Sequence, residues 1–208
     1  VINLPPDPIP SSAGNGTQVN LFDGGYIVWT FAANSGSEVN VYGGTVYESV
    51  VANTGSVFNI FGGTVFNDFH ADGGTVNVSG GLIGKNFVAN ANSHVNITGG
   101  KFDTGFKAAS GSTVNLAGGS LAYLAANTGS AVNITGGGIG RRFIADAGSN
   151  VNVYGGEFRL DGVPISGLES IGSTALINIP VDSILSGTLA NGTPFHFTSV
   201  DNDSFASG

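Results

Sequence analysis

The sequence predicts an all-β fold, a single-stranded parallel β-helix (β-solenoid) of about eight coils with a short C-terminal β cap. The first observation is a V-N-I-T-G-G motif, identical or related copies of which recur at intervals of 18 to 20 residues. The second is that the aligned copies share residue types at fixed positions, and the third is that no segment has the sustained hydrophobic period of an α-helix. The repeat places its central asparagines at Asn20, Asn40, Asn59, Asn77, Asn96, Asn115, Asn133 and Asn152.

The repeat occupies residues 19–162, which predicts one elongated domain. The Pro-rich opening, residues 1–18, is expected to be an extended arm. After residue 162 the repeat fades, and residues 163–208 are expected to form the β cap, with two β segments around the turn L-A-N-G-T-P-F. Such a cap would cover the edge of the last coil, which would otherwise pair with another chain.

Each unit is expected to contain about three short strands. The V-N-V or V-N-I segment alternates apolar and polar residues, which predicts a strand with one buried face. The Gly-Gly pair and the N-T-G-S segment supply turn residues between strands. Coils that stack in parallel lie about 4.8 Å apart. We therefore expect the central asparagines to form a ladder of hydrogen-bonded amides along the axis.

Three positions counted from each Gly-Gly pair are apolar in most units and predict internal stacks. The second position holds Ile27, Val46, Val65, Ile83, Phe102, Leu121, Ile139 and Phe158. The sixth holds Phe31, Val50, Phe69, Phe87, Phe106 and Phe143, with Leu124 in a unit one residue short. The eighth holds Ala33, Ala52, Ala71, Ala89, Ala108, Ala126 and Ala145.

These columns resemble those of parallel β-helix proteins, namely the pectate-lyase-like superfamily and the solenoid regions of surface adhesins. The resemblance covers residues 19 to about 162 and implies a right-handed helix. A left-handed helix built on hexapeptides is the alternative, but it requires coils of one strict length. Because the intervals here vary from 18 to 20 residues, the right-handed form fits better.

Composition excludes several classes of function. A net charge of −8 with only six Lys and Arg argues against a general nucleic-acid binder. The absence of Cys excludes disulfides and thiolate sites, and no apolar run is long enough to predict a membrane span. The chain contains no Met and begins V-I-N-L-P-P, so we expect a secreted or cell-surface protein from which a leader has been removed.

The basic residues depart from the repeat, and all of them fall within seven positions after a Gly-Gly pair. They are Lys85, Lys101, Lys107, Arg141, Arg142 and Arg159. The same arc carries Trp29, Glu48, Asp68, His70, Asp103 and Tyr123. Its fourth position reads Trp29, Glu48, Asn67, Lys85, Thr104, Tyr123 and Arg141 in successive units. Its seventh position reads Ala32, Val51, His70, Val88, Lys107, Ala125 and Ile144.

A basic strip with aromatic residues on an acidic protein suits an acidic polysaccharide, because Lys and Arg pair with carboxylates. The expected activity is a lyase that cleaves uronate-containing chains by β-elimination, which needs a cation, a base and an acid. The catalytic candidates are Lys107, Tyr123 and His70 for proton exchange, with Arg141 or Arg142 to neutralise the carboxylate. The substrate-binding candidates are Trp29, Glu48, Lys85, Lys101, Arg142 and Arg159. Pectate-lyase-like enzymes use Lys, Arg and Tyr in such roles, so the resemblance implies the same chemistry.

Other functions stay open. Hydrolysis would use a carboxylate pair, for which Glu48 and Asp68 lie in adjacent coils. No cofactor is expected, and a calcium site at Asp68 and Asp103 is not indicated by an acidic cluster. The main alternative is a noncatalytic structural or adhesive solenoid, in which the basic arc is a solvated face. A carbohydrate-binding module is a further alternative. Self-association is compatible with either function.

Overall fold

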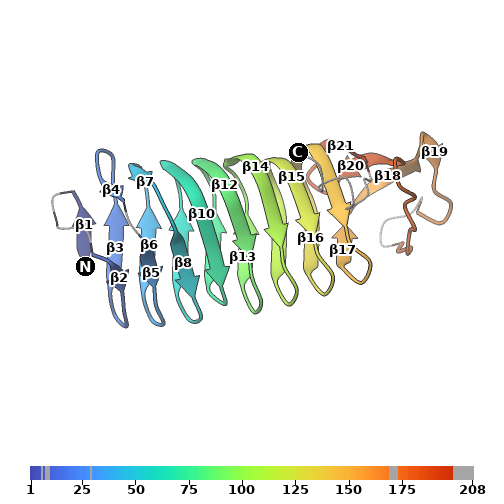
Figure 1. Cartoon of the computed structure of the whole chain (residues 1–208). Coiled ribbons are helices and arrows are strands. Elements are labelled where there is room, and N and C mark those ends of the chain that lie inside the picture. Colours follow the sequence, from blue (N-terminus) through green and yellow to red (C-terminus); the bar gives the residue numbers. More distant parts are fainter. Residues whose placement is uncertain (6, 8–9, 29, 169–172, 199–208) are drawn as a thin grey trace, which may run out of the picture.

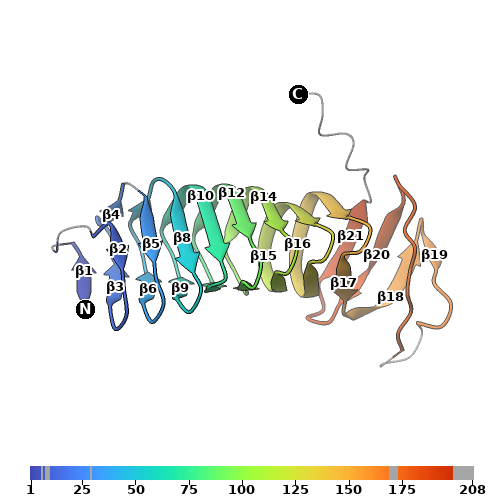
Figure 2. The ribbon, with the colours of Figure 1, turned by 60° about the horizontal axis from the view of Figure 1, so that its bottom comes forward.

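The protein is an elongated rod of stacked coils with a small second sheet at its C-terminal end (Figures 1 and 2). The structure is a computed structural model that describes residues 1–5, 7, 10–28, 30–168 and 173–198, except for the side chain of Arg141. The described residues form β-strands and no helices, and 17 of the strands make one parallel sheet wound along the rod. The all-β parallel solenoid of about eight turns is confirmed.

Each coil has three strand segments, which form three faces of the rod. The first face carries the Asn-containing strands β1 (Ile2–Leu4), β3 (Gln18–Leu21), β6 (Glu38–Val41), β9 (Val57–Ile60), β11 (Thr75–Val78), β13 (His94–Ile97) and β17 (Asn150–Val153). The second carries β4 (Tyr26–Ile27) and β7 (Thr45–Val46), and the third β2 (Ser12–Ala13), β5 (Phe31–Ala33) and β8 (Val50–Asn53). Longer strands join the second and third faces: β10 (Thr64–Asp72), β12 (Leu82–Ala89) and β14 (Lys101–Ala108). Finally, β15 (Thr113–Ala126) and β16 (Ala131–Ala145) continue through all three faces.

The predicted apolar columns form the core of the rod. The second-position column is in register from Ile27 to Ile139, and the sixth-position column from Phe31 to Phe143. Within the sixth-position column, the rings of Phe69 and Phe87 stack with centroids 4.6 Å apart. The coil spacing of a parallel sheet thus becomes the stacking distance of buried aromatic rings.

The predicted asparagine ladder is also present, and all of its side-chain hydrogen bonds are donated toward the N-terminal end of the rod. Each Asn amide nitrogen donates to the side-chain oxygen of the Asn one coil earlier, as from Asn96 to Asn77 and from Asn115 to Asn96, both at 2.9 Å. The ladder runs from Asn3 to Asn152. Because these amides share one face, each satisfies its neighbour and holds the coils in register.

The Gly-Gly pair is required by the corner that follows the first face. In the six units between the first and the last, its second residue has a positive φ, as at Gly44 (71°) and Gly100 (83°), a conformation that other residues adopt rarely. Its first residue packs against the previous coil, since a Cβ on Gly99 would overlap the carbonyl oxygen of Ser79. Both glycines are therefore explained by backbone geometry and packing.

Residues 1–18, expected as an extended arm, contribute two strands to the parallel sheet. Strand β1 pairs in register with β3, and β2 pairs with β5. Leu4 and Ala13 are buried in the same core as the later coils. The Asn ladder accordingly begins at Asn3, one unit before the first copy that the sequence repeat identified.

The eighth repeat leaves the solenoid after its Asn strand. Strand β17 is the last strand of the parallel sheet, whereas β18 (Gly155–Leu160) pairs antiparallel with β19 (Val163–Pro164) and β20 (Ile184–Leu189). The assignment of Phe158 to the second-position column is therefore wrong, and its ring instead contacts Phe195 with centroids 6.0 Å apart. Ala145, the last alanine of its column, is consequently exposed.

The predicted C-terminal hairpin is formed by β20 and β21 (Pro194–Thr198), which pair antiparallel. Its turn binds the solenoid, because the backbone nitrogens of Ala190 and Asn191 donate to the carbonyl oxygens of Tyr154 and Thr135. The ring of Phe197 lies 5.2 Å from that of Phe143, between centroids. Apolar residues of the hairpin thus extend the hydrophobic core of the rod.

Candidate functional site

Most of the candidate residues belong to what we call the post-glycine face, the outward side of residues 26–33, 45–52, 64–71, 82–89, 101–108, 120–126 and 138–145. It comprises the second and third faces of seven successive coils (Figure 2). Inward residues of these segments fill the core, so the alternation of the strands leaves every second side chain for function.

His70 and Lys107 belong to one column of this face, as the seventh-position alignment predicts. His70 is in register with Val51 and Val88, and Val88 with Lys107. His70 is half-buried, whereas Lys107 is exposed. Two coils separate them, so their backbones lie about 10 Å apart.

Tyr123 occupies a different register from the one expected. The fourth-position alignment places it between Thr104 and Arg141, but the structure pairs it with Gly105 below and Arg142 above. The short unit lacks one residue, and the sheet absorbs that deficit before Tyr123 rather than after it. Arg142, not Arg141, is therefore the arginine in register with Tyr123.

The Tyr123 ring lies across Gly105. A Cβ on Gly105 would overlap the ring, and Gly105 is buried although it is on the outward side of its strand. Lys107 lies two residues further along the same strand, so its side chain leaves on the same side. Gly105 thus provides the space in which a half-buried phenol lies beside the position of an exposed ammonium group.

Three groups of the proposed chemistry are therefore brought together on consecutive coils: Lys107 on β14, Tyr123 on β15 and Arg142 on β16. Arg142 is half-buried, which is compatible with a fixed guanidinium position. His70 is on the same face but two coils below Lys107, so it lies nearer to a neighbouring unit of any chain bound along the axis. Arg141 is on β16, and its side chain lies outside the described residues.

The other candidate residues are spread along the rod and do not form one group. Lys85 and Glu48 are exposed, and neither has an ion pair within the described part of the chain. Lys101 is bound to Asp103 at 2.6 Å, which reduces its availability to an anionic ligand. Trp29 lies outside the described residues. Arg159 is on β18 in the antiparallel sheet, where it donates to the carbonyl oxygen of Gly162, and so it does not stack with the other cations.

The aspartates of the two alternative sites, the hydrolytic carboxylate pair and the calcium site, are engaged by neighbouring side chains. Asp68 accepts a hydrogen bond from Asn86 at 2.8 Å, and Asp103 is engaged by Lys101. Among the described residues no cluster of three His, Asp or Glu side chains is placed to hold a metal ion. The same residues include no helix long and apolar enough to cross a membrane.

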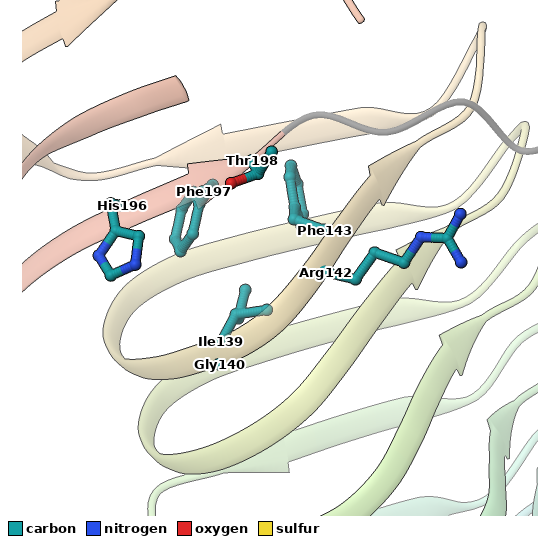
Figure 3. A pocket seen from close by; sticks show the side chains of 7 residues that line it. All are labelled: Ile139, Gly140, Arg142, Phe143, His196, Phe197 and Thr198. Atoms are coloured by element: carbon teal, nitrogen blue, oxygen red, sulfur yellow. The ribbon is translucent and has the colours of Figure 1, made fainter. Parts of the chain in front are cut away.

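A hollow of about 30 Å³ lies where the last full coil meets the C-terminal hairpin (Figure 3). Ile139, Phe143 and Phe197 form its apolar wall, and His196 lies at one side while the side chain of Arg142 extends away to the other (Figure 3). This volume holds about two water molecules and no sugar ring.

The structure also contains aromatic side chains on the outside that the sequence reasoning did not single out. Phe22, Tyr42 and Phe61, each two residues after the central Asn of its repeat, stack with centroids 5.3 and 5.0 Å apart. Tyr47 and Phe66 stack on the post-glycine face at 5.5 Å. These ladders could have been found in the sequence, because an aromatic residue recurs at the same position of successive repeats. Because stacked rings cover each other's faces, these ladders present mainly edges to solvent.

Comparison with protein-family models, curated proteins and solved structures finds no match to this chain.

Proposed function

We propose that the protein binds an acidic polysaccharide along the post-glycine face and cleaves it by β-elimination. The observation that supports this most is the register that places Lys107, Tyr123 and Arg142 on three consecutive coils. A polysaccharide laid along the rod would cross all three. The protein's overall charge of −8 makes this basic strip the part of the molecule most favourable for an anionic chain.

Each of the three groups has a role that β-elimination needs. The guanidinium of Arg142 pairs with the uronate carboxylate and stabilises the negative charge that develops there when the adjacent carbon loses its proton. The amine of Lys107 accepts that proton, and the hydroxyl of Tyr123 donates a proton to the leaving glycosidic oxygen. The carbon–oxygen bond breaks as the carbon–carbon double bond forms, so no oxidant is required. His70 contacts a neighbouring sugar.

We further propose that the solenoid is right-handed, related to the pectate-lyase-like superfamily, and secreted. Variable coil length supports the handedness, and the Lys, Tyr and Arg combination supports the relationship. Lys85 then extends the binding strip by one coil from Lys107 toward the N-terminus, and Lys101 lies on the same strand as Lys107.

Incubation with alginate, pectate and glucuronan tests the proposal, with absorbance of the unsaturated uronate product as the readout. We expect at least one substrate to give a rise. Tyr123→Phe and Arg142→Ala should reduce the rate about 10²-fold or more, the usual contribution of one proton-transfer or charge-stabilising group. Tyr154→Phe and His94→Ala serve as controls, since both residues are exposed and lie on or just after first-face strands. No rise on any substrate, with an unchanged melting temperature, would refute both cleavage and binding.

A noncatalytic adhesive or structural solenoid, or a carbohydrate-binding module, is the second candidate, favoured by the openness of the post-glycine face and by the exposed aromatic ladders. For the module, an acidic polysaccharide raises the melting temperature without producing unsaturated product. For the structural protein, retention on a surface persists when Tyr123 and Arg142 are replaced.

A further inference from the structure

The first coil of the rod, strands β1 and β2, is joined to the second coil by short strand pairings. Strand β1 pairs with β3 through three residues and β2 with β5 through two, whereas β15 and β16 pair through eleven. Segments with few backbone hydrogen bonds and few buried contacts open at a lower free energy than the rest of a protein. We therefore expect the first coil to separate from the rod more readily than the later coils.

Asp7 closes the outer edge of β1. The backbone nitrogen of Phe22 donates to the carbonyl oxygen of Leu4, so Leu4 faces the second coil and Asn3, its neighbour in the strand, faces away from it. On that outer side the Asn3 nitrogen donates to the Asp7 carboxylate at 2.8 Å, and the Asp7 nitrogen donates to the Asn3 carbonyl oxygen at 2.9 Å. Pro5, which follows β1, has no N–H group. From Asn3 to Pro5 this edge therefore has no free backbone donor with which to bind another strand.

We propose that two copies of this chain associate end to end through β3 once the first coil opens, and that Asp7 limits the association by keeping the coil closed. The contact joins the two N-terminal ends of the rod. The second sheet lies at the other end (Figure 1), so the two copies of that sheet are far apart in the dimer and do not obstruct it. The post-glycine faces stay uncovered, so the association does not depend on the proposed lyase activity.

The backbone of β3 fits its own copy. Because Phe22 directs its nitrogen toward β1, the alternate residues Gln18 and Asn20 direct their backbone groups to the same side. A two-fold axis that passes through Asn20 and is normal to the first face makes the two β3 strands antiparallel. It places Asn20 opposite Asn20 of the second copy and Gln18 opposite Phe22, with both backbone groups of each residue pointing at its partner. These are the hydrogen-bonded pairs of an antiparallel ladder, and two-fold symmetry forms them on both sides of the axis.

The side chains of the opened end fit as well. The amides of the Asn ladder donate toward the N-terminal end, and Asn20 donates to Asn3 at 2.9 Å while the first coil is closed. When the coil opens, the Asn20 amides of the two copies meet, and each can donate to the oxygen of the other. Leu21 lies in register with Leu4 of the first coil, so opening exposes apolar surface that Val19 and Leu21 of the second copy cover again.

Sedimentation equilibrium of the whole chain measures the dissociation constant of this dimer. Asp7→Ala removes the carboxylate that binds Asn3, and loss of one charge-assisted hydrogen bond should raise the open fraction about tenfold. Because two open copies form each dimer, we expect the dissociation constant to fall about a hundredfold. Leu4→Ala opens the same coil from its buried side and should act in the same direction.

Asp161→Ala is the matched control. Asp161 makes the same two hydrogen bonds in the second sheet, because the Ile184 nitrogen donates to its carboxylate at 2.8 Å and its own nitrogen donates to the Ile184 carbonyl oxygen at 2.9 Å. Its replacement removes the same contact at the other end of the rod, so the dissociation constant should stay that of the wild type. Asp7→Asn keeps an acceptor oxygen beside Asn3 and should also give a value close to that of the wild type.

A further substitution identifies the strand that pairs. Added to Asp7→Ala, Asn20→Asp places two carboxylates opposite each other on the two-fold axis, and we expect it to abolish the dimer. Asn152→Asp makes the same change at the other end of the ladder and should leave the dimer intact. A dissociation constant that neither Asp7→Ala nor Leu4→Ala lowers, an equal effect of Asp161→Ala, or a dimer that persists with Asn20→Asp would overturn the proposal. None of these outcomes bears on the lyase assay.

Discussion

At the scale of single residues, the candidate site depends on Gly105. Its missing side chain leaves the space in which the Tyr123 ring lies, and this space sets the ring beside the strand that carries Lys107. Tyr123 is half-buried, so its hydroxyl is held by packing instead of moving freely in solvent. Preorganisation of this kind is what an acid–base group requires.

Gly105→Ala tests this dependence. The new methyl group overlaps the Tyr123 ring, so we expect the ring to move and the free energy of unfolding to fall by about 1–3 kcal/mol. Lyase activity should fall with it. Gly138→Ala is the control, because Gly138 is exposed on β16 with no atom within 4 Å of an added Cβ. Equal melting temperatures for the two variants in thermal denaturation would show that Tyr123 does not rest on Gly105.

At the scale of structural elements, side-chain ladders hold neighbouring coils together. Each Asn between the two ends of the ladder is both donor and acceptor, so one substitution there breaks two hydrogen bonds and leaves two partners unpaired. The external aromatic ladder works in the same way, since Tyr42 stacks on Phe22 and on Phe61.

Asn96→Ala should lower the free energy of unfolding by about 1–3 kcal/mol, the usual cost of unpaired, partly buried amides. Asn67→Ala is the comparison, because Asn67 is a half-buried strand residue outside the ladder. Denaturant titration of both variants measures the difference. If Asn67→Ala is as destabilising as Asn96→Ala, the ladder does not contribute to stability.

Tyr42→Ala should cost about 1–3 kcal/mol because it removes two stacked ring pairs. Tyr154 provides a control at the same repeat position in the last unit. Both tyrosines are 49% exposed, but within the described residues Tyr154 stacks on no other ring. Its replacement by Ala should change the melting temperature less than Tyr42→Ala does. A larger effect for Tyr154 would mean that exposure, and not stacking, determines the cost.

At the scale of the whole molecule, the columns of the core could be predicted because packing in a repeat protein depends only on coil length and residue type. The columns of the site were harder to predict. Tyr123 was assigned to the wrong neighbours because the sequence does not say where a shortened coil loses its residue. Phe158 and Arg159 were placed in the solenoid because Gly-Gly continues there, although β18 pairs in another sheet. Aligning the repeats thus predicts the wrong neighbours for residues in units that depart from the regular coil.

The central claim is that the post-glycine face acts on acidic polysaccharides through Lys107, Tyr123 and Arg142. The most direct measurement is the absorbance of unsaturated uronate during incubation with alginate, pectate or glucuronan, for the wild-type chain and for Tyr123→Phe. We predict a rise with at least one substrate, reduced about 10²-fold or more in the variant, whose melting temperature stays that of the wild type. A rise that Tyr123→Phe leaves unchanged, or no rise with any of the three substrates, would contradict the claim.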